Sequence, residues 1–336
     1  MASPKFAVIV GATGNQGGAV ARRFLQAGFR VRGICRNAES DSARALAALG
    51  AEIYTADLNE GGAALTAAFA GANVIFSVTQ YWEPFFAGRA RAAQMGVTCR
   101  RFAYDVEVQQ GRNIADAAAA TAGSLDDNGF LVSTLSHART CSSGRLTELY
   151  HFDAKAEVFP GYVRDKYPEL AAKMSCIHTG YFYTSYKILP TSWLGKKDDG
   201  SIEMAFTTDP AKRVPHLMPN LDMGNFTFAV YQMPPGKAYM AAGTVCTWPE
   251  WIAAWSKVTG VSATYRQASR EEMIASTNDQ MLGEEIEDMY SYTSDPGYDG
   301  GMDLLYAEDL VKAGIECPMT PLEDWLKTVD WSEWLP

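Results

Sequence analysis

The chain has 336 residues, of which 47% are hydrophobic and 20% are charged, as in an ordinary soluble globular protein. The formal net charge of −10 lacks the basic surface that a nucleic-acid backbone requires, so nucleic acid is not expected as a direct partner. The six cysteines form no C-x-x-C pair, no apolar run is long enough to span a membrane, and no secretory signal precedes the first strand-like run. We therefore expect a cytoplasmic protein with free thiols, no metal site and no membrane association.

Short apolar runs alternate with helical stretches at the beginning of the chain. Strands are predicted at residues 5–10, 30–35, 51–56 and 73–79, with helices between them at 17–27, 38–49 and 61–70. Such alternation is typical of a parallel sheet whose two faces are covered by helices. The predicted fold class is therefore α/β, with a Rossmann-type doubly wound parallel sheet.

The alternation is less regular after residue 80. The stretch 81–102 shows too little periodicity for a prediction, and an alanine-rich helix is predicted at 106–121. Strands follow at 129–134 and 174–179, with a helix at 148–159 between them. Pro160 and Gly161 should break or kink that helix before a second helical segment near 162–170.

The last part of the chain has a different composition, since most of the prolines and tryptophans lie there. Helices are predicted at 222–231, 248–258, 270–275, 281–290, 307–313 and 321–329. We expect a Rossmann cofactor domain at 1–183 and a smaller, mostly helical lobe for a substrate or partner at 184–336. This lobe should lie over the carboxyl edge of the sheet, while segments such as 222–245 pack back onto the Rossmann sheet.

The first predicted strand runs into G-A-T-G-N-Q-G-G at residues 11–18 and then into a helix. The first glycine permits a tight turn, the second lets the backbone approach a pyrophosphate, and the third lets the helix pack close to the strand. The N–H groups at the start of the helix then face the anion. A glycine turn without a ligand is the alternative, but strand, loop and helix together favour a dinucleotide site. The expected contacts come from Gly11, Thr13, Gly14, Asn15, Gln16 and Gly17.

The end of the second strand favours NADP(H) as the cofactor. NAD-binding proteins usually have an acidic residue here for the ribose hydroxyls, whereas this strand ends at Arg36 and Asn37. Arg36 can pair with the 2′-phosphate of NADP and stack on adenine, with a solvated surface arginine as the alternative. Residues after the second, third and fourth strands complete the predicted cofactor site: Arg36, Asn37, Asp57, Leu58, Thr79 and Gln80.

Several segments together resemble the NmrA-like family of atypical short-chain dehydrogenases/reductases. The loop has the G-x-x-G-x-x-G spacing of short-chain relatives. Further similar stretches are V-T-Q-Y-W-E at 78–83, Q-G-R with A-D at 110–116, G-R-L at 144–146, H-F-D-A-K-A-E-V at 151–158 and G-Y-F at 180–182. The resemblance covers about the first 190 residues. The sequence departs from the family by extra residues around 95–105, next to the expected substrate side.

The resemblance implies roles for two groups of residues. Gly180, Tyr181 and Phe182 are expected to border the nicotinamide. Short-chain reductases also use a Y-x-x-x-K pair on the helix after the fifth strand, where tyrosine donates a proton and lysine holds the ribose. In this chain Lys155 is retained as the cofactor-holding lysine, but His151 stands four residues before it.

The standard acid is therefore missing. Tyr150 is one position away, about 100° around the helix, and cannot simply replace the tyrosine. His151 is a candidate acid because a histidine pKa suits neutral pH, with a packed structural histidine as the alternative. Ser133 and Thr134 end the fifth strand near the place of the reductase serine, where hydroxyls without a function are also common. The predicted catalytic set is Lys155, His151 and Ser133.

Two functions are compatible with these residues. Aromatic residues at strand ends, Tyr81, Trp82, Tyr181, Phe182 and Tyr183, suggest a flat or aromatic substrate. The first function is an NADPH-dependent oxidoreductase acting on a small carbonyl, imine or enone, for instance in specialised metabolism. The second is a non-catalytic NADP(H)-binding redox sensor that acts through a protein partner. The missing tyrosine favours the sensor, whereas the aromatic second lobe and the extra residues favour the enzyme, which we prefer.

Overall fold

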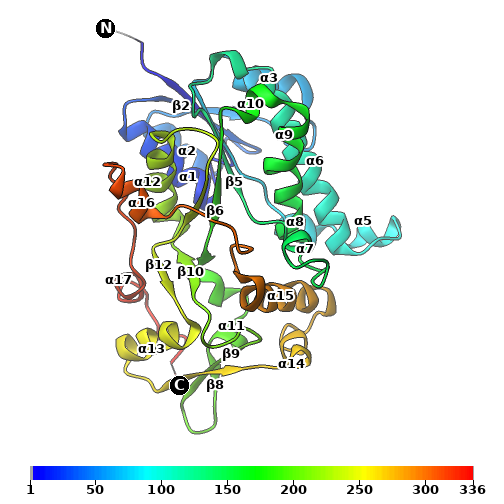
Figure 1. The fold of residues 1–336 in the computed structure, drawn as a ribbon, viewed down its shortest axis with the longest axis vertical. Coiled ribbons are helices and arrows are strands. Elements are labelled where there is room, and N and C mark those ends of the chain that lie inside the picture. Colours follow the sequence, from blue (N-terminus) through cyan, green and yellow to red (C-terminus); the bar gives the residue numbers. More distant parts are fainter. Residues whose placement is uncertain (1–2, 336) are drawn as a thin grey trace.

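A seven-stranded parallel sheet forms the centre of the first half of the molecule (Figure 1). The computed structural model describes residues 3–335. The strands lie in the order β3-β2-β1-β4-β5-β6-β11, and every neighbouring pair is parallel. This doubly wound order confirms the predicted fold class. The strands are β1 (Phe6–Val10), β2 (Arg30–Cys35), β3 (Glu52–Thr55), β4 (Val74–Ser77), β5 (Phe130–Thr134), β6 (Met174–Thr179) and β11 (Ala238–Ala241).

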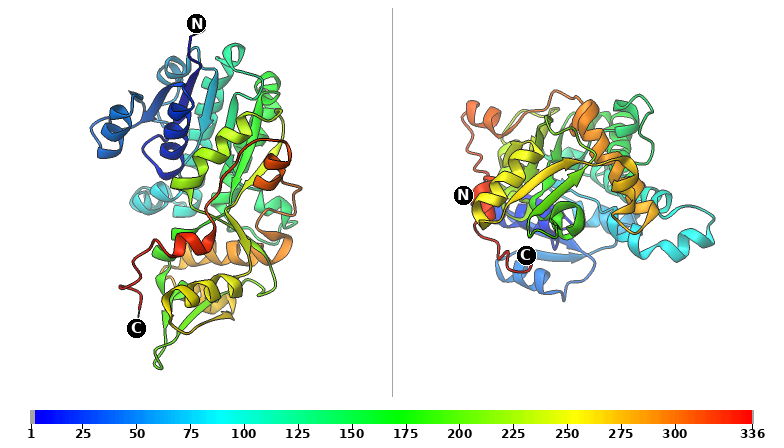
Figure 2. Two further views of the ribbon diagram at one scale, coloured as in Figure 1. Left: turned by 90° about the vertical axis from the view of Figure 1, so that its left-hand side faces the viewer. Right: turned by 90° about the horizontal axis from the view of Figure 1, so that it is seen from below.

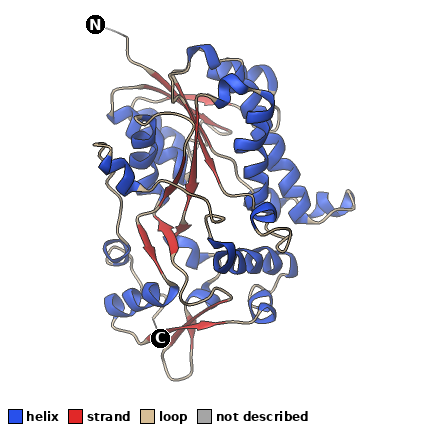
Figure 3. Cartoon of the chain, in the orientation of Figure 1, coloured by secondary structure: helices blue, strands red, loops and turns tan. Residues whose placement is uncertain are grey.

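Helices cover both faces of the sheet, as Figure 3 shows. One face carries α1 (Asn15–Gln26), α2 (Asp41–Ala48), α12 (Pro219–Tyr231) and α16 (Ala307–Lys312). The other face carries α3 (Gly62–Phe69), α6 (Cys99–Ala119) and α8 (Tyr150–Ala156). Within β1, Ala7 and Ile9 pack with the first group and Phe6, Val8 and Val10 with the second. Because both faces are covered, the strand is apolar at every position.

The stretch around residue 90, for which the sequence gave no prediction, is helical. It forms α4 (Trp82–Ala87) and α5 (Arg89–Gln94), and α5 extends away from the body of the molecule (Figure 1). Helix α6 then begins at Cys99 rather than at residue 106, since the Thr98 side chain caps it by accepting from the Arg101 N–H at 3.1 Å. The extra residues around 95–105 are therefore the turn before α6 and its first turns.

The helix after β5 is interrupted where the sequence predicts. Helix α8 continues into residues Glu157–Tyr162, where Phe159 leaves the helical region with φ −121° and ψ 100°. Pro160 follows directly, and a proline disfavours helical backbone at the residue before it. The chain resumes a helical course in α9 (Val163–Lys166) and α10 (Pro168–Ala171).

The second lobe lies at one end of the large sheet, as the turned views of Figure 2 also show. Its helices α13 (Trp248–Thr259), α14 (Arg270–Ala275), α15 (Gln280–Tyr292) and α17 (Leu322–Leu326) fall in predicted ranges, while α7 (Ala138–Cys141) and α11 (Pro190–Trp193) were not predicted. The lobe is less helical than expected because it also contains two small three-stranded sheets. Their strands are β7 (Tyr181–Phe182), β10 (Val214–Leu217) and β12 (Thr244–Cys246), and β8 (Gly195–Lys196), β9 (Ile202–Phe206) and β13 (Ala263–Gln267).

Part of the chain after residue 184 returns to the first half. Strand β11 pairs with β6 and becomes the seventh strand, and α12 packs along α1. The approach of the two helices is close, since a Cβ at Gly224 would lie 2.4 Å from the backbone oxygen of Ala19. The segment 222–245 thus packs on the Rossmann sheet.

Three further findings concern the described residues 3–335. No helix there is long and apolar enough to cross a membrane. No three His, Cys, Asp or Glu side chains gather as potential metal ligands in this range. Each of the six cysteines carries a free thiol, and all except Cys141 are buried.

Candidate functional site

The glycine loop between β1 and α1 is shaped by three glycines with separate tasks. Gly11 has a left-handed φ of +65°, and its carbonyl accepts a 2.9 Å hydrogen bond from the Gly14 N–H, which closes the turn. A Cβ at Gly17 would lie 2.3 Å from the Gly11 oxygen, so the helix can start this close to the strand only with glycine there. At Gly14 an added Cβ would meet the Gly11 oxygen at 3.3 Å, which is a close contact. Gly14 lines the cleft, and glycine there keeps this side of the loop clear for a ligand.

The start of helix α1 is suited to binding an anion. Gly14 is its N-cap with extended backbone, no side chain caps the first turn, and no acidic residue stands in it. The first N–H groups of such a helix lack intrahelical partners and carry the positive end of the helix dipole. A phosphate at this position would satisfy these N–H groups.

A cleft of about 740 Å³ opens in front of this helix start. It runs along the carboxyl ends of β1, β2, β3 and β4 and is closed on its far side by residues of α4 and α6. Most of the predicted cofactor residues line it: Gly11, Thr13, Gly14, Asn15, Gln16, Gly17, Arg36, Asp57, Leu58, Thr79, Gln80 and Phe182. Asn37 lies just outside, where its side-chain oxygen accepts from the Glu39 N–H at 2.9 Å.

Arg36 is paired inside the cleft rather than free in solvent. Its two terminal nitrogens donate to both carboxylate oxygens of Glu83 on α4, at 2.5 and 2.8 Å. The hydrogen bonds that Arg36 donates to Glu83 raise the pKa of Arg36 above its usual value. The guanidinium keeps an exposed edge, since 62% of the side chain is accessible. Arg36 therefore offers a fixed positive charge where the sequence predicts the ribose phosphate.

Lys155 does not line the cleft directly. Its ammonium donates to Glu107 on α6, whose carboxylate is buried. The Thr79 hydroxyl donates to the same Glu107 oxygen at 2.7 Å, and Thr79 does line the cleft. Lys155 is thus separated from the cleft by one carboxylate and is held by a buried ion pair.

His151 is enclosed in a second buried cluster. Its Nδ1 lies 2.6 Å from Glu285 on α15, and the Tyr81 hydroxyl donates to the other Glu285 oxygen at 2.8 Å. Burial lowers the pKa of His151 to about 3 and raises the pKa of Glu285 well above its usual range. His151 is therefore neutral at physiological pH. This corrects the expectation that its pKa suits proton donation at neutral pH, because desolvation removes the charged form.

The hydroxyls at the end of β5 point in different directions. Ser133 donates to the side-chain oxygen of Gln16 at 2.8 Å, so it braces a residue of the cleft wall. Thr134 donates to the backbone oxygen of Phe159 at 2.6 Å and is fully buried. Ser133 is thus next to the cleft, whereas Thr134 belongs to the packing between β5 and the chain after α8.

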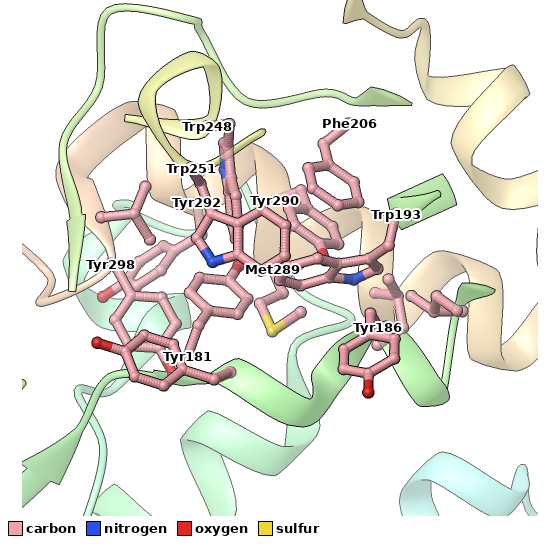
Figure 4. Close-up of a cluster of buried hydrophobic side chains, with 14 of the residues drawn as sticks. Tyr181, Tyr186, Trp193, Phe206, Trp248, Trp251, Met289, Tyr290, Tyr292 and Tyr298 are labelled. Atoms are coloured by element: carbon pink, nitrogen blue, oxygen red, sulfur yellow. The ribbon is translucent and has the colours of Figure 1, made fainter. Parts of the chain in front are cut away.

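The aromatic residues at the strand ends mostly build the core of the second lobe. Tyr181 stacks on Tyr290 with ring centres 5.6 Å apart and contacts Trp248 and Tyr298, as Figure 4 shows. Tyr183 and Tyr81 are likewise buried. Among the five aromatic residues proposed to face a substrate, Phe182 is the one that lines the cleft. Gly180 lies where a Cβ would meet the Pro215 backbone at 2.7 Å.

Sequence reasoning missed the acidic partners of this site, Glu83, Glu107 and Glu285. Glu107 could have been found, because it stands on the apolar stripe of the predicted alanine-rich helix with Ala103, Gly111 and Ile114, all buried. A carboxylate on such a stripe needs a cationic or hydrogen-bonding partner. Glu83 and Glu285 carried no comparable signal, since their partners are distant in the sequence.

Comparison with known proteins gives the family. The NmrA-like family model matches residues 4–335. The chain belongs to the NmrA-like family. The match continues beyond residue 190, so the family likeness includes the second lobe. Among curated relatives, the NmrA-like family domain-containing oxidoreductase cpsB of Aspergillus campestris is 45% identical over 86 residues. That alignment covers 25% of this chain and 25% of the relative.

Solved structures show the same fold over nearly the whole chain. NmrA, a negative transcriptional regulator, in complex with NADP has a TM-score of 0.70 at 17% identity, covering 98% of this chain and 96% of that chain. The Escherichia coli NADPH-dependent quinone oxidoreductase complexed with NADPH has a TM-score of 0.65 at 20% identity, covering 96% and 99%. These two solved structures hold NADP and NADPH, and their names describe a negative transcriptional regulator and a quinone oxidoreductase.

Proposed function

We propose that this chain is an NADP(H)-dependent oxidoreductase that reduces a small carbonyl, imine or enone. The observation that carries the proposal is the cleft, in which an uncapped helix start and Arg36 face the same space. A dinucleotide with a phosphorylated ribose has one anionic group for each of these features. The curated relative cpsB, named as an oxidoreductase, supports the enzymatic assignment.

The residues of the cleft fit such a cofactor. The loop at Gly14 and the N–H groups of α1 would receive the pyrophosphate, and Arg36 would receive the 2′-phosphate. Thr79 and Phe182 line the part of the cleft nearest to β4 and β6. When bound, the reduced cofactor supplies a hydride. The task of the chain is to hold the acceptor beside it and exclude water.

The protonation chemistry favours one of the three substrate classes. The tyrosine of standard reductases has no counterpart on α8, and His151 is neutral in its buried cluster. A protonated imine needs only a hydride, whereas a carbonyl also needs a proton on oxygen. We therefore rank a protonated imine first.

The alternative function is a non-catalytic NADP(H)-binding regulator that acts through a protein partner. It is supported by the missing tyrosine and by the likeness to NmrA, a negative transcriptional regulator. The two functions are separated by following NADPH absorbance with wild-type protein and a panel of imines, carbonyls and enones. The enzyme predicts substrate-dependent oxidation of NADPH with at least one class. NADPH binding without oxidation across the panel would favour the regulator.

A further inference from the structure

Glu107 occupies an unusual position beneath the cleft. Its side chain is 1% exposed, yet its neighbours along the helix, Val106 and Gln110, line the cleft. A carboxylate removed from water in this way is costly unless charges and hydrogen bonds compensate it. The residues that form hydrogen bonds with Glu107 therefore indicate its role.

Both partners of Glu107 use the same oxygen atom. Lys155 and Thr79 donate to Oε1, while Oε2 is buried and has no hydrogen-bond partner within residues 3–335. Lys155 comes from α8 and Thr79 follows β4, so one carboxylate joins three separate elements. Since only 14% of the Lys155 side chain is exposed, its flexible stem is held in one place.

The hydrogen bond to Glu107 also determines whether the Thr79 hydroxyl can donate or accept toward the cleft. Because its proton is used in the bond to Glu107, the hydroxyl can act toward the cleft only as an acceptor. Such a group suits a donor, such as a sugar hydroxyl. The Lys155 ammonium has three protons and uses one on Glu107, so it keeps two for acceptors.

We propose that Glu107 is a positioning residue of the cofactor site: with its charge balanced by Lys155, it fixes the Thr79 hydroxyl so that this group accepts a hydrogen bond from a sugar hydroxyl of the dinucleotide. This inference rests on the proposed function, because it takes NADP(H) as the ligand of the cleft. Glu107 acts on the ligand through Thr79, and Lys155 acts through Glu107.

A double-mutant cycle on NADPH affinity tests the proposal without requiring turnover. We expect Glu107→Gln and Lys155→Met each to weaken NADPH binding about tenfold in titration calorimetry. The double variant should bind about as weakly as either single variant, since Glu107 and Lys155 both act through the Thr79 hydroxyl. Losses that multiply to about a hundredfold, or no loss with Glu107→Gln, would overturn the proposal. If wild-type protein bound no NADPH, the proposed function itself would fail instead.

A matched control separates positioning from general destabilisation. Asp222 on α12 is also 1% exposed and accepts hydrogen bonds from Thr320, but it lies outside the cleft. Asp222→Asn should lower thermal stability and leave NADPH affinity unchanged, and an equal loss of affinity there would contradict a specific role for Glu107.

A second variant keeps the test valid if Glu107→Gln does not fold. Glu107→Leu combined with Lys155→Met removes the whole ion pair. This double variant should match Lys155→Met alone in NADPH affinity, and a further tenfold loss would overturn the proposal.

Discussion

Arg36 at the end of β2 and Glu83 in the first turn of α4 face each other across the cleft and form two parallel hydrogen bonds of 2.5 and 2.8 Å. The pair uses the two terminal nitrogens of the guanidinium and leaves its other edge open. Glu83 thereby fixes the Arg36 guanidinium on the wall of the cleft. The charge that we propose to select the cofactor is thus a paired one.

Replacing Arg36 should abolish the preference for the phosphorylated cofactor. Arg36→Ala is expected to weaken NADPH binding by about 1.5–3 kcal/mol, roughly ten- to hundredfold, because a charge-assisted contact is lost. NADH binding should change little. Calorimetric titration of both cofactors measures the difference. Arg44→Ala on the neighbouring α2 is the control, since Arg44 pairs with Asp41 outside the cleft; an equal loss for NADPH and NADH in Arg36→Ala would contradict the assignment.

The glycine loop offers a pair of substitutions with opposite consequences. Gly14→Val should fold, because Gly14 has extended backbone and a small shift relieves the 3.3 Å contact of its Cβ with the Gly11 oxygen, but it should lose NADPH binding by filling the ligand side of the loop. Gly17→Ala should instead lower the melting temperature strongly, because its Cβ would meet backbone at 2.3 Å. Thermal denaturation and calorimetry of both variants check this. NADPH binding retained by Gly14→Val would show that the loop does not receive the pyrophosphate.

His216 should make the protein sensitive to acid. It is fully buried beside Trp248, and burial lowers its pKa to about 3, compared with 6.5 for a histidine in water. As pH falls from 7 to 5, the unfolded chain takes up a proton that the folded protein does not, so stability is lost. The loss is about 2 kcal/mol from this residue. Urea unfolding of wild type and His216→Phe at both pH values measures it, and an identical pH dependence in the two proteins would refute the prediction.

Substitution of Lys155 distinguishes the enzymatic function from the regulatory one. In an enzyme, Lys155→Ala should lower turnover about a hundred- to a thousandfold, well beyond its effect on NADPH affinity, because a positioned cation stabilises the developing charge. Lys166→Ala, which removes an exposed lysine paired with Asp116, is the matched control and should be neutral. The assay is NADPH oxidation with any substrate found in the panel. Wild-type turnover in Lys155→Ala would remove this residue from the catalytic set.

Strands β2 and β6 have the predicted bounds: every position of β6 is buried, and β2 becomes buried toward its carboxyl end after an exposed Arg30. The small sheets of the second lobe escaped prediction because β7 and β8 have two residues each. In β9 the alternation of buried and half-buried residues was present but is short.

The loop glycines and Arg36 were identifiable because local spacing determines their positions. The environment of His151 was not, because Glu285 lies on a helix more than a hundred residues later and closes the site to water. A pKa assigned from residue type alone therefore failed there. The burial of Tyr181 could not be predicted for a similar reason, since the second lobe supplies the rings that enclose it. In both cases the surroundings of the side chain depend on contacts with segments that are distant in the sequence.

The central claim is that the cleft binds NADP(H), and calorimetric titration of the wild-type protein with NADPH and NADH tests it most directly. The paired guanidinium of Arg36 and the open start of α1 predict saturable binding of both, with NADPH at least tenfold tighter. Equal affinities would contradict the role of Arg36, and the absence of binding for either cofactor would contradict the assignment of the cleft.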